Sequence, residues 1–341
     1  MTNFILKDEN AVYYECGFSC DNELYLKFGE ESFFITDARY TTEAKQKIKK
    51  AKVVEAKNLF EEAAKLLQKY KIRKLHFDPI ELSVKELETL KESKYTYFEQ
   101  APDFSKKKRI IKTNKEIKLI KEAARLTNNA FDQFSSYLKR HGLGKNEKRL
   151  FFECCAKLSD YGEYELSFEP IVAINENAAK PHALATNKEL KIGSLILVDA
   201  GMKYERYCSD RTRVAQYNQD ISFDKKDQSF LSSKRQKVYD TLLRAQERAI
   251  KAAKPGVKAS SIDKAARDVI EKAGFGNYFV HSTGHGVGLD IHELPIISSK
   301  SQTIIEENMV FTIEPGIYLP GEFGIRIEDM VRIAHTRAVL L

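Results

Sequence analysis

The pattern of apolar and polar residues predicts helices and strands throughout the chain, arranged in two parts. In residues 1–108, it predicts strands near 12–14, 23–28, 32–36 and 74–77 and helices near 40–50, 58–70 and 84–92. In residues 109–341, it predicts helices near 114–140, 145–161, 235–253 and 260–273. A chain of 341 residues is long enough for two domains with separate cores.

Two strands of the second part each carry an aspartate. Leu195–Val198 is an apolar run that leads directly into Asp199, which predicts a buried strand with a carboxylate at its end. Asp210 begins an alternating strand in which Asp210 and Thr212 share a face. The segment between them is too short for a helix, so a hairpin with the aspartates side by side is expected. Either aspartate alone would suit a turn or a helix cap; the pair indicates a site.

Two later strands each carry a glutamate. The alternation around Thr312 and Glu314 puts both residues on one face of an otherwise apolar strand. Burying a glutamate in this way is costly unless it is paired or binds a cation. The next strand alternates so that Arg326 and Glu328 share a side. Taken alone, that strand fits an exposed edge with a surface ion pair equally well.

The stretch from His281 to His292 is the most specific pattern in the chain. Three of the seven histidines, His281, His285 and His292, fall within it together with three glycines, which let a backbone approach an ion or substrate closely. A glycine-rich nucleotide loop is the alternative, but the stretch lacks the expected Lys-Ser/Thr. A fourth histidine, His182, follows Pro181 and, taken alone, would be an ordinary loop residue.

These strands and loops together supply five metal-type ligands. Four carboxylates and one imidazole form a hard, oxygen-rich set that suits two divalent cations, and the four negative charges balance two dications. Such a pair of ions can activate water toward a carbonyl group, so the set predicts a metallohydrolase. In chain order the ligands are Asp199, Asp210, His285, Glu314 and Glu328.

The composition indicates in which part of the cell the protein works and which classes of protein it does not belong to. The chain is 43% hydrophobic and 31% charged, and no apolar run approaches the roughly 18 residues of a membrane span. The first ten residues lack the features of a signal peptide, and five cysteines without a repeated CxxC pair argue against a disulfide framework. We therefore expect a cytoplasmic enzyme. The basic block Lys106–Arg109 has no interleaved aromatics, so it is expected to be a solvated linker between domains and not a nucleic-acid contact.

The motifs resemble those of the metallopeptidase family that contains methionine aminopeptidase, aminopeptidase P and prolidase, and the resemblance covers nearly the whole chain. It is carried by the Asp199/Asp210 hairpin, by residues 281–292, by Glu314-Pro315-Gly316 and by the strand Arg326–Asp329. It implies an α+β protein in which a smaller creatinase-like α/β domain, residues 1–108, precedes a pita-bread catalytic domain, residues 109–341.

Two comparisons within that family restrict the activity. Thr36–Tyr40 after an apolar strand resembles the first domain of the Xaa-Pro peptidases and creatinase, which methionine aminopeptidases lack. Creatinase shares the fold but lacks the metal ligands, whereas all five are present here. The resemblance therefore implies cleavage before proline. The bond before proline is a tertiary amide and has no N–H for a peptidase to recognise. The enzyme therefore has to recognise the proline ring by its shape.

The resemblance also implies a role for each site residue. Two divalent ions, Mn²⁺ or alternatively Co²⁺ or Fe²⁺, would be held by the five ligands, with Asp210 and Glu328 bridging them. Glu314 would in addition carry a proton to the leaving nitrogen. Histidines would bind the substrate and its developing oxyanion or line the proline pocket, and three further residues would support the ligands. These are His182, His292 and His281, followed by Arg326, Tyr318 and Thr212.

Three functions remain open on the sequence. The compact segment from Glu314 to Glu328 favours an Xaa-Pro dipeptidase (prolidase), but an Xaa-Pro aminopeptidase acting on longer peptides shares it. A non-catalytic pita-bread binding protein is the third, against which the complete ligand set argues. The resemblance implies a homodimer with a proline-containing peptide as its substrate, and no nucleic-acid or membrane partner.

Three features depart from the family pattern. Asn175 stands where glycine is usual and is expected to adopt left-handed geometry, which asparagine tolerates. Lys180 beside Pro181 replaces a more apolar residue and is expected to affect selectivity near the substrate. Residues 217–234 are longer and more polar than the usual linker, so a surface excursion is expected there.

Overall fold

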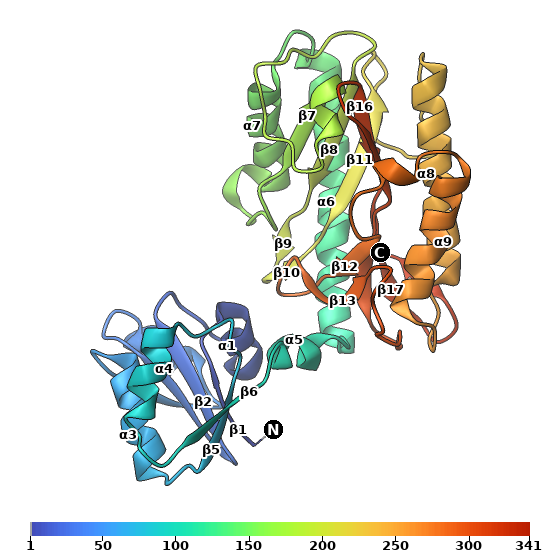
Figure 1. Ribbon diagram of the computed structural model, residues 1–341. Coiled ribbons are helices and arrows are strands. Elements are labelled where there is room, and N and C mark those ends of the chain that lie inside the picture. Colours follow the sequence, from blue (N-terminus) through green and yellow to red (C-terminus); the bar gives the residue numbers. More distant parts are fainter. Residues whose placement is uncertain (1) are drawn as a thin grey trace. The chain divides into compact units, whose positions relative to one another are not determined.

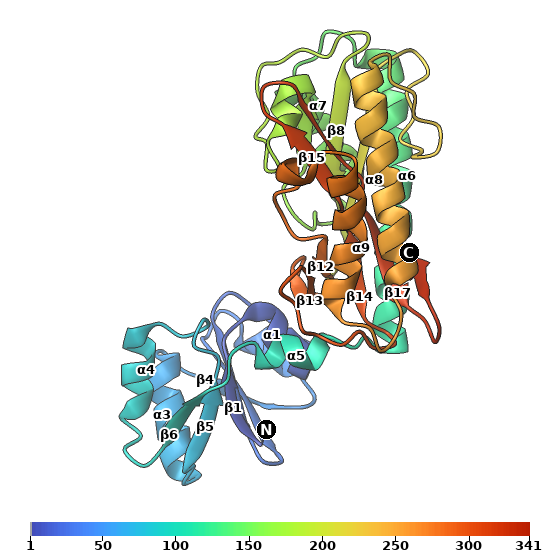
Figure 2. The ribbon, with the colours of Figure 1, turned by 45° about the vertical axis from the view of Figure 1, so that its right-hand side comes forward.

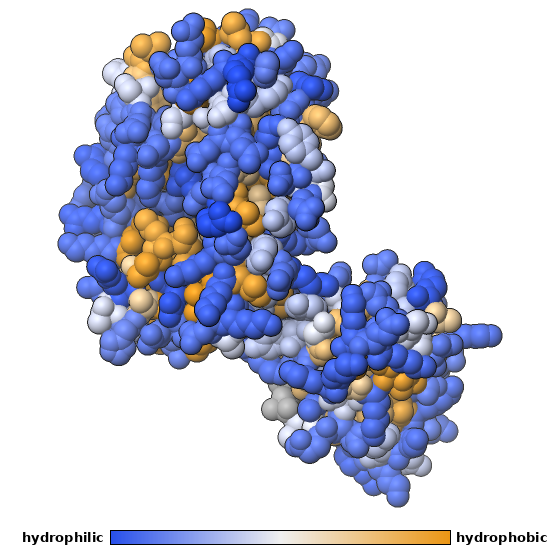
Figure 3. Space-filling model, turned by 180° about the vertical axis from the view of Figure 1, so that it is seen from behind, coloured by the Kyte–Doolittle hydropathy of each residue, from blue (hydrophilic) through white to orange (hydrophobic). Residues whose placement is uncertain are grey.

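The computed structural model describes residues 2–341 and divides into two compact units (Figure 1). The first unit ends at Lys108 and the second runs from Arg109 to Leu341. No helix within residues 2–341 is long and apolar enough to cross a membrane. On the face shown in Figure 3, apolar side chains form separate patches in a mostly hydrophilic surface.

The N-terminal unit is one six-stranded mixed sheet with helices on both faces, in the order β4-β3-β2-β1-β5-β6. Alternate residues of its strands serve two cores: Phe4 and Leu6 pack with α1 and α2, whereas Ile5 packs with α3 and α4. The elements are β1 (Asn3–Leu6), α1 (Glu9–Cys16), β2 (Glu23–Phe28), β3 (Glu31–Thr36), α2 (Thr41–Lys47), β4 (Lys52–Glu55), α3 (Leu59–Lys69), β5 (Lys74–Phe77), α4 (Val84–Lys91) and β6 (Tyr97–Gln100).

One predicted strand of this unit is wrong. Residues 12–14 lie inside helix α1, although valine and tyrosine favour strands. The helix forms because Asp8 caps it, accepting a hydrogen bond from the Ala11 amide at 2.8 Å, and Gly17 ends it with a positive φ of 78°. The short strands β1, β4 and β6 were not predicted, and the last two are only half-buried, so their apolar pattern is weak.

The catalytic unit contains the four helices predicted for it. They are α6 (Asn114–His141), α7 (Glu147–Leu158), α8 (Ser233–Ala252) and α9 (Ala259–Lys272). Thr113 and Glu116 form a capping box at the start of α6. Helices α8 and α9 run side by side along the C-terminal half of the unit (Figure 2).

The strands of the catalytic unit form three sheets that matter for the site. A three-stranded sheet has the order β11-β8-β7, a five-stranded sheet the order β13-β12-β14-β17-β18, and β15 pairs with β16. Their bounds are β7 (Ile171–Ile174), β8 (Leu195–Ala200), β11 (Arg211–Gln216), β12 (Gly284–Gly286), β13 (Glu293–Ile297), β14 (Val310–Ile313), β15 (Gly316–Leu319), β16 (Phe323–Arg326), β17 (Asp329–Ile333) and β18 (Ala338–Leu340). A small ribbon, β9 (Lys203–Tyr204) with β10 (Tyr207–Cys208), completes the β8–β11 connection.

Two cores hold these sheets. One packs α6 and α7 against one face of β7, β8 and β11, through residues such as Phe134 and Val198. The other packs α8 and α9 against β14, β16 and β17 and includes Leu197 from the opposite face of β8. The β11-β8-β7 sheet is therefore buried on both faces, which explains why the run before Asp199 is apolar without alternation.

The structure shows two of the loops in which the sequence departs from the family pattern, at Asn175 and at residues 217–234. Asn175 has a φ of 51°, which confirms the left-handed prediction, and its Oδ1 accepts a hydrogen bond from the Leu195 amide at 2.8 Å. Residues 217–232 contain no regular element, and α8 begins at Ser233. Polar residues such as Asp224 and Lys226 are exposed, as expected for a surface excursion, but Ile221, Phe223 and Phe230 are buried and anchor the segment in both cores.

Candidate active site

Antiparallel pairing of β8 and β11 brings the two aspartates together, as predicted. Asp199 on β8 lies opposite Thr212 on β11, and Asp210 immediately precedes β11. Both aspartates are buried, with exposed fractions of 8% and 7%. The ribbon β9–β10 bulges out between the paired strands and leaves this pairing intact.

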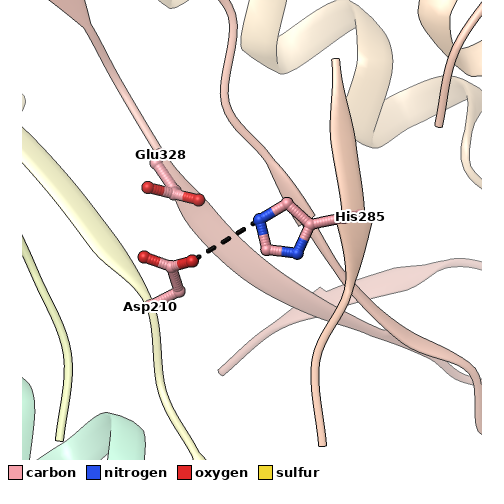
Figure 4. Close-up of side chains that lie close together, drawn as sticks. All are labelled: Asp210, His285 and Glu328. Atoms are coloured by element: carbon pink, nitrogen blue, oxygen red, sulfur yellow. Dashed lines mark ion pairs between the residues drawn. The ribbon is translucent and has the colours of Figure 1, made fainter. Parts of the chain in front are cut away.

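His285 enters the same space from β12. Figure 4 shows Asp210, His285 and Glu328 converging from three separate segments of the chain. Nε2 of His285 lies 3.6 Å from Asp210 Oδ2 and 3.4 Å from Glu314 Oε1. Its Nδ1 lies 3.0 Å from the Gly286 carbonyl, so a proton on Nδ1 donates to that oxygen and leaves Nε2 free to bind a cation.

A glycine lets β12 approach β14 closely enough for this geometry. A Cβ atom on Gly284 would lie 1.9 Å from the carbonyl oxygen of Thr312, a distance no side chain tolerates. The hydroxyl of Thr312 donates to Glu314 Oε1 at 3.3 Å and accepts from the His285 amide at 3.2 Å. This threonine therefore ties the histidine strand to the first glutamate.

Glu328 lies between β16 and β17 and is almost completely buried, with an exposed fraction of 1%. Its Oε2 accepts a 2.6 Å hydrogen bond from the Thr212 hydroxyl. The alternative of an exposed edge strand with a surface ion pair is wrong, because Arg326 is also buried. The second glutamate thus contacts the aspartate hairpin directly.

Arg326 braces the aspartate side of the site. Its guanidinium donates to Asp199 Oδ2 at 2.6 Å, to the Thr212 hydroxyl at 3.0 Å and to the Tyr318 hydroxyl at 2.6 Å. Tyr318 in turn lies 2.9 Å from His281 Nε2. The three supporting residues expected from the sequence therefore form one connected network behind the ligands.

The carboxylates are incompletely satisfied by the protein itself. Oδ1 of Asp199, Oδ1 of Asp210 and Oε1 of Glu328 are buried and lack a hydrogen-bond partner among residues 2–341. Ligand atoms of Asp210, His285 and Glu328 all lie within 4.8 Å of one another. Buried polar atoms normally have partners, so these oxygens indicate a bound cation. The donor set fits two hard divalent ions.

The pKa values of the candidate ligands in the metal-free site also favour a cation there. Burial raises the pKa of Glu314 to about 7. Burial, reinforced by repulsion from Glu328, raises the pKa of Asp210 well above its ordinary value, and burial with repulsion from Glu314 does the same for Glu328. Burial lowers the pKa of His285 to about 4, so its imidazole is neutral and able to bind a metal at pH 7.

The ligands open into a cavity of about 870 Å³. His281, His292 and His182 all line it, and the His292 ring lies 4.3 Å from that of His285 between centroids. Lys180 instead donates to Asn177 Oδ1 at 3.1 Å and is not among the cavity-lining residues. The apolar part of the wall includes Phe151, Phe168, Pro170, Ile171, Leu184, Ile291 and Ile296.

A buried charge cluster behind His292 was missed by the sequence reasoning. Glu293 follows this histidine and accepts from Lys112 Nζ at 2.9 Å, while Arg109 donates to Asp290 Oδ2 at 2.6 Å. Arg109 is 2% exposed, so the expectation of a solvated block at Lys106–Arg109 is wrong for its last residue. That block is helix α5 (Phe104–Arg109). Partners so far apart in the chain leave no local signal.

Comparison with known proteins identifies this arrangement. Residues 118–335 match metallopeptidase family M24, and residues 1–111 match the creatinase/prolidase N-terminal domain. The chain belongs to metallopeptidase family M24. It is thus a metallopeptidase in which the expected pita-bread catalytic domain follows a creatinase-type domain in the chain.

Relatives of this M24 peptidase carry two kinds of name. It is 37% identical over 258 residues to the Xaa-Pro dipeptidase of Pyrococcus furiosus, which covers 75% of this chain and 70% of the relative. The structure matches an Xaa-Pro dipeptidase from Bacillus anthracis with a TM-score of 0.90, at 32% identity over 99% of this chain and 92% of that one. It also matches an X-Pro aminopeptidase from Thermotoga maritima with a TM-score of 0.87, at 32% identity over 100% and 95%.

Proposed function

We propose that this M24 peptidase hydrolyses the peptide bond before proline in Xaa-Pro dipeptides, using two divalent metal ions. The observation that carries the proposal is the set of three buried, partnerless carboxylate oxygens that converge with His285 on one cavity. Such a set is costly to bury without cations. Relatives named Xaa-Pro dipeptidase supply the substrate class.

Five residues would hold the ions. Asp199, Asp210, His285, Glu314 and Glu328 offer four carboxylates and one neutral imidazole at the cavity. When bound, the ions supply a Lewis acid for the scissile carbonyl and lower the pKa of water. We propose Mn²⁺ as the metal, because manganese suits a site of carboxylate oxygens with a single nitrogen.

The side chains around the ligands orient the peptide and move a proton. Glu314 lines the cavity, and its raised pKa of about 7 suits a group that accepts a proton and passes it to the leaving nitrogen. His292 and His182 would bind the substrate carbonyl or carboxylate and stabilise the oxyanion. His281, held by Tyr318, would line the proline subsite.

An Xaa-Pro aminopeptidase remains the alternative, and one observation favours it. Pockets for drug-sized ligands span roughly 300–1,000 Å³, and the cavity of about 870 Å³ lies near the upper end of that range. A dipeptide is a small ligand, so the cavity leaves space for further residues of a longer peptide. A dipeptidase must instead close the far side of proline and bind its free carboxylate. Relatives named Xaa-Pro dipeptidase support the dipeptidase, and the compact chain between Glu314 and Glu328 fits it as well.

A matched pair of substrates separates the two activities. Protein stripped of metal is assayed on Ala-Pro and on Ala-Pro-Ala, with and without added Mn²⁺. Metal-dependent cleavage confined to Ala-Pro supports the dipeptidase. Cleavage of the tripeptide at a comparable rate makes the protein an aminopeptidase. If neither is cut while Mn²⁺ is bound, the Xaa-Pro assignment is wrong.

Two properties of the whole molecule complete the proposal. We propose a cytoplasmic homodimer. The family resemblance supports the dimer, and five cysteines without a disulfide pattern support the cytoplasm. Sedimentation of the metal-loaded protein tests the dimer, since a monomer at micromolar concentration contradicts it. Cell fractionation tests the location.

A further inference from the structure

Residues 217–234 hold a lysine in a fixed place next to the site. The segment is anchored by Ile221, Phe223 and Phe230, and the Phe223 ring meets the Phe131 ring edge-on at 5.6 Å. Tyr239 on α8 donates its hydroxyl to the Lys225 carbonyl at 2.8 Å. The backbone at Lys225 is therefore attached to a helix of the core.

The ammonium of Lys225 has two partners. It forms an ion pair with Asp329, the residue directly after Glu328, and donates to Oε1 of Gln246 on α8 at 3.0 Å. Asp329 is itself held by an ion pair with Arg213 on β11. The carboxylate thus anchors the lysine, and the lysine reaches the glutamine.

Gln246 connects the backbone segments that precede the two glutamate ligands. Its side chain is 1% exposed, and its Nε2 donates to the carbonyl of Ile313 at 3.1 Å and to that of Ile327 at 3.2 Å. Glu314 and Glu328 are the next residues in each case. One amide group therefore bridges the two strand ends that carry these ligands.

The lysine and the two carbonyls together hold the amide in one orientation. A glutamine amide has two N–H donors and one acceptor oxygen, whereas an ammonium only donates. With Lys225 on Oε1, both N–H groups remain for the two carbonyls. Without the ammonium, the buried oxygen loses its partner, which is costly, and only the two contacts to the carbonyls still hold the amide.

We propose that Lys225 is a positioning residue that sets the separation of Glu314 and Glu328 through Gln246. The inference rests on the proposed metal-dependent function of the site. Supporting groups of this kind commonly change metal affinity or activity by about 10- to 100-fold. The polar segment 217–234 then serves the metal centre and is more than a connection.

The test compares Lys225→Met with Lys226→Met, its exposed neighbour in the same segment. Mn²⁺ affinity is measured by calorimetric titration, and unbound Mn²⁺ by its electron paramagnetic resonance signal. We expect K225M to bind Mn²⁺ about 10- to 100-fold more weakly, with K226M close to wild type. At saturating Mn²⁺, K225M should lose kcat on Ala-Pro and keep its KM, because Lys225 does not line the cavity.

A second variant tests the route through the amide. Gln246→Glu keeps a partner for Lys225 but cannot donate to both carbonyls, so it should weaken Mn²⁺ binding in the same way. The double variant should bind no more weakly than Q246E alone, because the lysine acts through residue 246. Wild-type Mn²⁺ affinity in folded K225M, or in Q246E if K225M does not fold, overturns the proposal.

Two results distinguish this inference from the proposed function. If the wild-type protein binds no Mn²⁺ and cleaves neither peptide, the proposed function has failed. If the wild type binds Mn²⁺ and cleaves Ala-Pro while K225M matches it in affinity and kcat, only the positioning role has failed. A K225M protein that unfolds at lower urea but keeps wild-type affinity has a structural lysine and also refutes the role.

Discussion

Replacing Glu314 by glutamine should change the pH dependence of stability in the metal-free protein. Burial raises the pKa of this carboxyl from its ordinary value of 4.5 to about 7. Between these values the folded protein holds a proton that the unfolded chain has released, so stability falls as the pH rises through this window. A shift of this size corresponds to about 3 kcal/mol. Glutamine does not titrate and escapes that loss.

The measurement is urea denaturation of wild type and E314Q at pH 5 and pH 8 in the presence of a chelator. The difference in unfolding free energy should move in favour of E314Q by about 2–3 kcal/mol across this range. Groups away from the site titrate equally in both proteins and cancel in the difference. Repulsion from Glu314 raises the pKa of Glu328 and Asp210, so its loss in E314Q moves the difference in the same direction. With excess Mn²⁺ at pH 8, the wild type should become more stable than E314Q, because the variant has lost a charged ligand. A difference that is independent of pH without metal would refute the assigned burial of this carboxyl.

Further predictions address the remaining parts of the site. Arg326→Met should lower the stability of the metal-free protein by about 3–5 kcal/mol, since it leaves Asp199 unpaired; a loss under 1 kcal/mol in urea denaturation would contradict the network. Gly284→Ala should abolish Mn²⁺-dependent cleavage, because its Cβ meets the Thr312 carbonyl; a fully active variant would show that β12 can shift freely. Asp210→Asn should bind fewer than two Mn²⁺ ions per chain by metal analysis, and an unchanged count would exclude Asp210 as a ligand.

The convergence of the candidate ligands was largely predictable because they lie in short local patterns. Each carboxylate follows or interrupts an apolar strand, where a charge is conspicuous, and His285 lies in a glycine-rich stretch. Strand pairing then places Asp199 beside Thr212 without further information. Asn175 shows the same logic for the backbone, since an asparagine where the family usually has glycine indicated left-handed geometry.

The supporting contacts were not predictable because they join residues far apart in the chain. Lys225 reaches Asp329 and Arg109 reaches Asp290, and in both pairs the sequence shows only charges that resemble ordinary surface residues. In α1 the error was of another kind. Strand-type residues such as Val12 follow a capping aspartate, and the local cap decided the structure against side-chain propensity.

The proposed ligands come from both halves of the catalytic unit, and neither half alone provides the whole set. Asp199 lies in β8 and Asp210 immediately before β11, whereas His285, Glu314 and Glu328 follow helices α8 and α9 in the chain. If the chain were cut between β11 and α8, each fragment would carry an incomplete set. Binding of Mn²⁺ would then report the reassociation of the fragments, so this enzyme offers a natural basis for a split-protein sensor.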